Sequence, residues 1–123
     1  MNEEGLIHQI HEALPDLSGQ YAQELAGIIT RIVDALTPAR IYVFGSQARG
    51  DATDESDVDL LLVMENSETP EHRIAQAAYR AATPYSFSLD ILVMSQEIFN
   101  RRSRAVASLP AKVLREGQLL YAA

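Results

Sequence analysis

Three short apolar runs, each bounded by turn residues, most constrain the fold of this chain. They are RIYVFG (Arg40–Gly45), DVDLLLVM (Asp57–Met64) and FSLDILVM (Phe87–Met94). Runs of this length that are rich in β-branched and aromatic residues are typical of β-strands. Segments with helical spacing precede and separate them. The sequence therefore predicts an α/β (α+β) domain in which a small sheet is flanked by helices.

The helices are predicted from apolar spacing, from capping residues and from the proline or glycine that ends each segment. Leu6, Ile7, Ile10 and Leu14 form a stripe that stops at Pro15. The remaining predicted elements are helices at about 18–36 and 71–82, short helical turns after Ser95 and from Pro110 to Gly117, and an edge strand in QLLYA at 118–122.

Composition excludes several classes of protein. The 123 residues carry a net charge of -7 and include no cysteine, which excludes disulfides and thiolate metal sites. An acidic domain binds nucleic acid poorly, so no direct nucleic-acid binding is expected. No apolar run reaches the length of a membrane span, and the N-terminus lacks the features of a secretory signal. We expect a cytoplasmic protein with one domain, 1–123, and an N-terminal helical extension at about 1–17.

Acidic residues are unevenly distributed, and two of them begin a predicted strand. Eight of the 17 acidic residues lie between Asp51 and Glu71. Asp57 and Asp59 are two positions apart, so their side chains point to one face of a strand and repel each other. Asp90 lies within the next predicted strand, and if the two strands are neighbours the three carboxylates converge. Oxygen ligands of this kind suit Mg²⁺ or Mn²⁺, although Asp-x-Asp is also common as a solvated pair.

Gly45 and Ser46 directly follow the first predicted strand. Glycine lets the backbone approach a ligand closely, and serine adds a hydroxyl and a backbone N–H. A helix that begins at Ser46 would direct its free N–H groups at an anion. Gly-Ser after a strand is usually only a turn. Together with the carboxylates, however, it predicts a site where a phosphate donor and a bound metal meet, as phosphoryl or nucleotidyl transfer requires.

The segment GSQARGDATDESDVDL (45–60) resembles the signature of the polymerase-β-like nucleotidyltransferase superfamily, and in particular its smallest branch, the minimal nucleotidyltransferases. The resemblance implies a mixed sheet with flanking helices and an enzyme that uses ATP and Mg²⁺, with Mn²⁺ as an alternative. It implies that Gly45 and Ser46 contact the triphosphate. It also implies that Asp57 and Asp59 are paired metal ligands, and that Asp90 is a third ligand and the general base.

The same resemblance implies a partner. Minimal nucleotidyltransferases often pair with a HEPN-domain ribonuclease toxin and, as the antitoxin, silence it by moving AMP from ATP to one of its tyrosines. A hetero-oligomer with such a toxin is therefore expected. Two alternatives stay open at this point. The chain could modify a small hydroxyl compound such as an antibiotic, or it could mask a toxin by contact alone.

Other charged residues are more ambiguous. Arg49 in the glycine loop could contact a phosphate through its guanidinium, or form a salt bridge to Asp51, Asp54 or Asp57. His8 and His11 have the spacing of half a metal site, but no further His or Cys completes it. The cluster RRSR (Arg101–Arg104) is basic in an acidic protein, and a solvated turn is its simplest interpretation.

Overall fold

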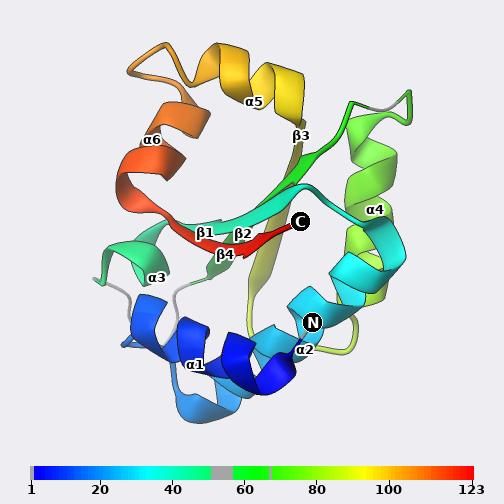
Figure 1. Cartoon of the computed structure of the whole chain (residues 1–123). Coiled ribbons are helices and arrows are strands. Elements are labelled where there is room, and N and C mark those ends of the chain that lie inside the picture. Colours follow the sequence, from blue (N-terminus) through cyan, green and yellow to red (C-terminus); the bar gives the residue numbers. More distant parts are fainter. Residues whose placement is uncertain (1, 51–56, 67) are drawn as a thin grey trace.

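The computed structural model describes residues 2–50, 57–66 and 68–123 (Figure 1). Its helices and strands alternate along the chain as the sequence predicts. In chain order they are α1 (Glu3–Ala13), α2 (Gly19–Leu36), β1 (Arg40–Phe44), α3 (Ser46–Arg49), β2 (Val58–Met64), α4 (Glu71–Ala82), β3 (Leu89–Ser95), α5 (Gln96–Arg102), α6 (Leu109–Glu116) and β4 (Gln118–Ala122).

Capping residues explain several of the helix boundaries. The Ser18 side chain accepts a hydrogen bond from the backbone N–H of Tyr21, and Ser95 accepts one from Ile98 in the same way. These serines satisfy backbone N–H groups that have no partner inside the helix. At the other end of the last helix, Gly117 is the C-cap residue of α6. The predicted helix starts at Ser18 and Ser95 are thus confirmed.

The sheet is mixed, as expected, and has the strand order β3-β2-β1-β4. β1 pairs antiparallel with both β2 and β4, whereas β2 pairs parallel with β3. Strand limits differ slightly from the predicted ones. β2 begins at Val58, one residue after Asp57, and β3 covers Leu89–Ser95 instead of Phe87–Met94. The difference arises because hydrogen bonding to a neighbouring strand, which composition does not reveal, sets where a strand begins.

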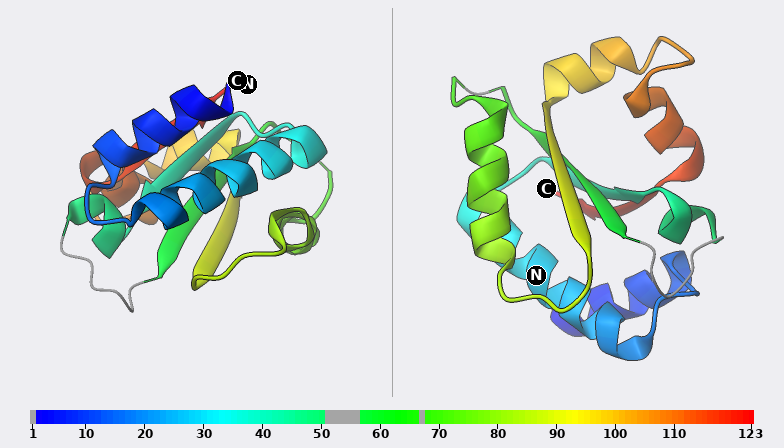
Figure 2. Two further views of the ribbon diagram at one scale, coloured as in Figure 1. Left: turned by 90° about the horizontal axis from the view of Figure 1, so that it is seen from below. Right: turned by 180° about the vertical axis from the view of Figure 1, so that it is seen from behind.

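Helices cover both faces of the sheet, so the fold has three layers (Figure 2). One face packs against α1, α2 and α4, and it buries Leu60 and Leu62 in the larger core cluster. The opposite face packs against α5 and α6, with Leu61 and Val63 in a smaller cluster that includes Phe99. Alternation along β2 thus assigns Asp59 to the same face as Leu61 and Val63. No helix in the described ranges is long and apolar enough to cross a membrane.

The loop between α4 and β3 is fixed by a side chain from α2. The Arg31 guanidinium donates hydrogen bonds to the carbonyl oxygens of Ala81 at 3.0 Å, Ala82 at 2.6 Å and Pro84 at 3.4 Å. These carbonyls lie at the C-terminal end of α4, where a positive charge is favourable. Arg31 therefore ties α2 to the segment that leads into β3.

Candidate active site

The three predicted aspartates lie at one end of the sheet, where β2 and β3 begin. Asp59 is the register partner of Asp90 across the parallel β2–β3 pair, and of Phe44 at the end of β1. Asp57 is exposed and directly precedes β2. Because residues opposite each other in a sheet point to the same face, Asp59 and Asp90 share the face on which α5 and α6 lie. β2 and β3 are adjacent strands, which is the condition stated in the sequence analysis for the carboxylates to converge.

Gly45 lies directly against the Asp59 carboxylate. Its backbone has a φ of 78° and a ψ of −158°, a combination essentially restricted to glycine. A Cβ atom at Gly45 would overlap an Asp59 carboxylate oxygen, and it would lie 3.3 Å from Asp59 Cγ. The glycine turn and Asp59 are therefore packed together. Only a residue without a side chain lets the end of β1 come this close to Asp59.

α3 is four residues long: Ser46 is its first residue and Arg49 its last, with Gly50 as the C-cap. The condition stated in the sequence analysis, a helix that begins at Ser46, is met. The first backbone N–H groups of a helix have no partner inside it. In α3, the intrahelical bonds are those that the N–H groups of Arg49 and Gly50 donate to the carbonyl oxygens of Gly45 and Ser46. Ser46 is half-buried and next to Gly45. The Gly45-Ser46 turn therefore borders the aspartates on the side of β1.

The electrostatics of Asp59 fit a cation-binding position. Burial raises the pKa of the Asp59 carboxyl above its ordinary value, the carboxylates of Asp90 and Asp57 raise it further, and the Arg49 guanidinium lowers it. A bound cation would relieve this repulsion between carboxylates, and oxygen donors are the ligands that Mg²⁺ and Mn²⁺ prefer. Arg49 is close enough to act on Asp59. Of the three salt-bridge partners considered for Arg49 in the sequence, Asp51 and Asp54 lie outside the described residues.

The ligand set is not fully assembled. Within residues 2–50, 57–66 and 68–123, no three or more His, Cys, Asp or Glu side chains are grouped closely enough to hold a metal ion. Asp57 in particular is exposed at the start of β2. The roles of Asp57, Asp59 and Asp90 as ligands, and of Gly45, Ser46 and Arg49 in nucleotide binding, thus stay predictions.

Tyr79 is a neighbour of the site that sequence reasoning missed. Its hydroxyl donates a hydrogen bond to Asp90 Oδ1 at 3.2 Å and accepts one from the backbone N–H of Ile91 at 2.8 Å. Burial raises the pKa of Tyr79, the Ile91 N–H lowers it, and the Asp90 carboxylate raises it. No pattern in the sequence identifies this contact, because Tyr79 belongs to the apolar stripe of α4 and reaches Asp90 only through the packing of α4 on β3.

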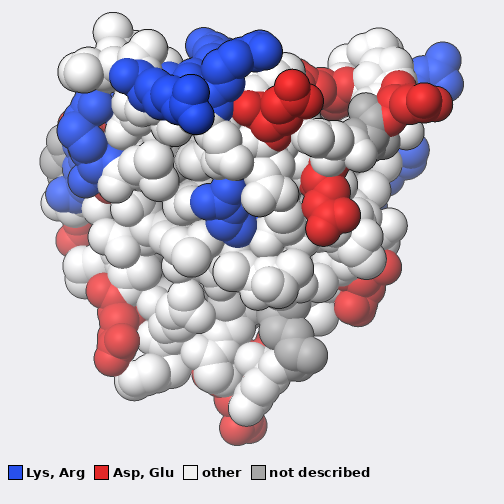
Figure 3. Space-filling model, turned by 45° about the horizontal axis from the view of Figure 1, so that its top comes forward, with Lys and Arg blue, Asp and Glu red and all other residues white. Residues whose placement is uncertain are grey.

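The other charged residues considered above do not join this group. His8 pairs with Glu12, at 3.1 Å between Nε2 and Oε1, on the exposed side of α1. Arg101, Arg102 and Arg104 are exposed at the end of α5 and just beyond it. Figure 3 shows Lys and Arg side chains gathered on the side of the molecule where α5 and α6 lie.

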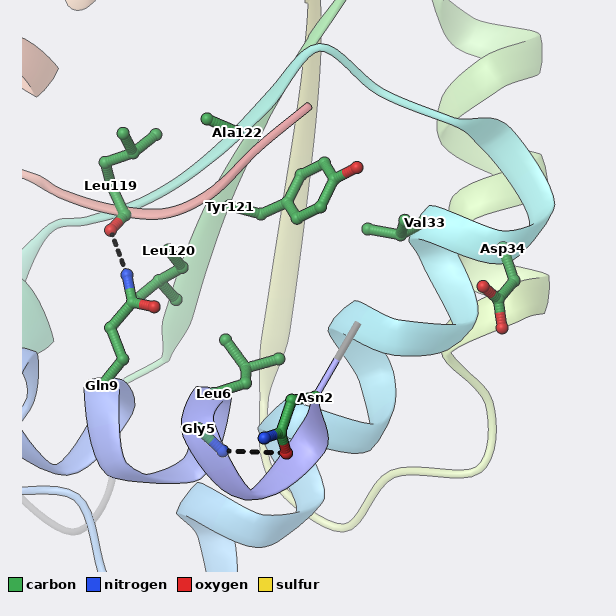
Figure 4. Close-up of a pocket in the computed structure, with 10 residues that line it drawn as sticks. All are labelled: Asn2, Gly5, Leu6, Gln9, Val33, Asp34, Leu119, Leu120, Tyr121 and Ala122. Carbon is green, nitrogen blue, oxygen red and sulfur yellow. Dashed lines mark hydrogen bonds between the residues drawn. The ribbon is translucent and has the colours of Figure 1, made fainter.

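A separate cleft lies at the opposite edge of the sheet. It has a volume of about 720 Å³ and is bordered by α1, α2 and β4, with Leu6, Gln9 and Tyr121 among its lining residues (Figure 4). Gln9 Nε2 donates a hydrogen bond to the Leu119 carbonyl oxygen across it at 3.0 Å. None of the candidate site residues lines this cleft.

Comparison with known proteins decides the family. Residues 24–119 match the family described as "Nucleotidyltransferase domain". This chain belongs to that family. The match includes the Gly45-Ser46 turn and all three aspartates, so the resemblance noted in the sequence is confirmed and the protein is a nucleotidyltransferase.

Relatives of this nucleotidyltransferase include two proteins of Methanocaldococcus jannaschii, each named "Putative protein adenylyltransferase". One is 34% identical over 82 residues, which are 67% of this chain and 77% of the relative. The other is 43% identical over 54 residues, which are 44% of this chain and 52% of the relative.

Two solved structures resemble the nucleotidyltransferase. A crystal structure of a "putative nucleotidyltransferase" from Sulfolobus solfataricus has a TM-score of 0.60 and 18% identity, and the alignment covers 99% of this chain and 89% of that chain. This likeness confirms the fold. A crystal structure described as a "toxin-antitoxin with AMP-PNP" has a TM-score of 0.48 and 22% identity, with 79% of this chain and 72% of that chain covered.

Proposed function

We propose that this nucleotidyltransferase is a Mg²⁺-dependent protein adenylyltransferase. It transfers AMP from ATP to a tyrosine of a HEPN-domain ribonuclease toxin, and it thereby acts in the cytoplasm as the antitoxin. The observation that carries the proposal is the packing of Gly45 against the Asp59 carboxylate, with Asp90 opposite Asp59 in the sheet. The turn that we propose to bind phosphate and the aspartates that we propose to bind the metal are thus adjacent, as nucleotidyl transfer requires.

Two further observations support the protein acceptor. Both M. jannaschii relatives are named as protein adenylyltransferases, and one of them is matched over 77% of its length. The sequence signature resembles that of minimal nucleotidyltransferases, which often pair with a HEPN toxin. A complex with the toxin follows from this proposal, because the acceptor tyrosine must reach Asp90.

Each residue of the site has a distinct role in the proposed reaction. Asp57, Asp59 and Asp90 would hold Mg²⁺, which when bound neutralises the charge of the triphosphate and of the reacting oxygen atoms. Ser46 and the free N–H groups at the start of α3 bind phosphate oxygens, and the Arg49 guanidinium can add charge-assisted hydrogen bonds. Gly45 lets the backbone of the turn pack against Asp59, which brings the turn next to the proposed metal ligands.

Asp90 acts on the acceptor. A tyrosine hydroxyl has an ordinary pKa of about 10, so it is a weak nucleophile at neutral pH unless a base removes its proton. The Asp90 carboxylate takes that proton as the tyrosine oxygen bonds to the α-phosphorus of ATP. The bond from this phosphorus to the oxygen that bridges to the β-phosphate breaks, and pyrophosphate leaves with the electron pair. The tyrosine then carries AMP.

The test is intact mass spectrometry of the toxin after incubation with this protein and Mg·ATP. We expect the toxin to gain the mass of one or more AMP groups with the wild-type protein, and none with Asp90→Asn. Both proteins should bind the toxin. A toxin that stays unmodified with the wild-type protein would refute the transferase role. Equal neutralisation of the toxin by Asp90→Asn would indicate that contact alone masks it.

A further inference from the structure

The Tyr79 hydroxyl links the backbone of β3 to the carboxylate of Asp90. It accepts a hydrogen bond from the Ile91 N–H at 2.8 Å and donates one to Asp90 Oδ1 at 3.2 Å. A hydroxyl has one proton to donate. The Tyr79 oxygen accepts the bond from the Ile91 N–H, so the hydroxyl proton remains available for the bond to the Asp90 carboxylate. The two bonds together fix which way the hydroxyl points.

The position of β3 explains why this link exists. β3 is at the edge of the sheet and pairs only with β2 among the described strands, so some of its backbone N–H groups point away from the sheet. The Ile91 N–H finds its partner in α4, which packs beside β3 (Figure 2). The ring of Tyr79 packs on the core that α4 shares with α2, whereas Asp90 belongs to the opposite face of the sheet. Tyr79 therefore reaches round the edge of β3 to meet Asp90.

Asp90 itself is exposed, and this is what makes the contact consequential. An exposed aspartate with no anchor samples several side-chain rotamers. Within the described part of the chain, Tyr79 is the side chain that holds the Asp90 carboxylate. With Oδ1 bonded to Tyr79, Oδ2 is the carboxylate oxygen that this bond leaves for the reacting groups.

We propose that Tyr79 is a positioning residue, which holds the Asp90 carboxylate in the orientation that nucleotidyl transfer needs. The inference rests on the proposed function, because the importance of Asp90 comes from its role there. Tyr79 does not touch the nucleotide or the acceptor. It acts through Asp90, much as hydrogen-bond partners behind metal ligands orient those ligands in other enzymes.

The first test does not depend on activity. Tyr79→Phe keeps the ring and its packing and removes only the hydroxyl. Tyr21→Phe is the control, because Tyr21 is also half-buried and its ring packs against Phe87. The three-bond couplings to Asp90 Cγ, measured by NMR, report the χ1 rotamer. We expect one rotamer in the wild type and in Tyr21→Phe, and averaging over rotamers in Tyr79→Phe. An unchanged Asp90 rotamer in Tyr79→Phe would overturn the proposal.

The second test is kinetic. Tyr79→Phe should lower kcat for AMP transfer by about 10- to 100-fold, the usual effect of removing such an orienting partner. KM for ATP should change less than about twofold, because Tyr79 makes no contact with the triphosphate-binding turn. A wild-type kcat in Tyr79→Phe would overturn the proposal.

The two tests separate this inference from the proposed function. If the wild-type protein transfers no AMP to the toxin, the proposed function fails. The coupling constants would still show whether Tyr79 fixes the Asp90 side chain.

Discussion

Replacing Gly45 with alanine should impose two separable costs at the centre of the site. The φ of 78° and ψ of −158° lie in a region essentially closed to residues with a Cβ atom, which costs about 1–3 kcal/mol. The new methyl group would also overlap the Asp59 carboxylate, which would have to move. We therefore expect Gly45→Ala to lower the free energy of unfolding by about 2–4 kcal/mol, the backbone cost plus the displacement of Asp59.

Urea unfolding measures this loss, and two further variants assign it. Gly50→Ala is the matched control. Gly50 also has a positive φ, 81°, but among the described residues the atom nearest to a Cβ there would be an Asp16 carboxylate oxygen at 3.8 Å, so only a backbone cost of about 1–2 kcal/mol is expected. In an Asp59→Ala background, Gly45→Ala should lose the part of its cost that comes from the overlap. The reasoning fails if Gly45→Ala is as stable as the wild type, or if its cost is the same with and without the Asp59 carboxylate.

Three further substitutions test other parts of the account. Asp59→Asn should stabilise the metal-free protein at neutral pH. The pKa of Asp59 is raised in the folded state, so folding favours the protonated carboxyl. This contribution to stability is lost as the pH rises through the folded-state pKa, whereas Asn stays uncharged. The gain should vanish in unfolding curves recorded below about pH 3, where the wild-type carboxyl is mostly protonated in both the folded and the unfolded state. Arg31→Ala should cost about 1–3 kcal/mol in urea unfolding, because it leaves the carbonyls at the end of α4 without their charged donor, and Arg31→Lys should restore only part of it. Ser46→Ala should slow AMP transfer about 100-fold in a labelled-ATP assay with little change in stability; unchanged turnover would reduce Gly45-Ser46 to a plain turn.

Much of the fold follows from local signals in the sequence. Ser18 and Ser95 cap helices, and Gly117 ends one, because each position depends on the conformation of a few neighbouring residues. The pairing of strands is different. Nothing within β2 or β3 specifies that they lie side by side and parallel, so the approach of Asp59 to Asp90 was conditional until the register was known.

The site shows the same division. The order of Gly45, Ser46, Asp57 and Asp59 along the chain was enough to predict the chemistry, because these residues lie within one turn and the start of one strand. The close packing of Gly45 against Asp59 and the hydrogen bond from Tyr79 to Asp90 were not predictable in this way. The first contact joins two neighbouring strands. The second joins a helix, α4, to the edge strand β3.

The central claim is that the three aspartates and the Gly45-Ser46 turn bind one metal–nucleotide complex. Its most direct test is a crystal structure with Mn²⁺ and a non-hydrolysable ATP analogue, in which anomalous scattering locates the metal. The account predicts a Mn²⁺ ion bound to carboxylate oxygens of Asp57 and Asp59 on the side of Asp90, with the triphosphate against Gly45 and Ser46. A metal bound elsewhere, or a triphosphate that does not contact this turn, would contradict it.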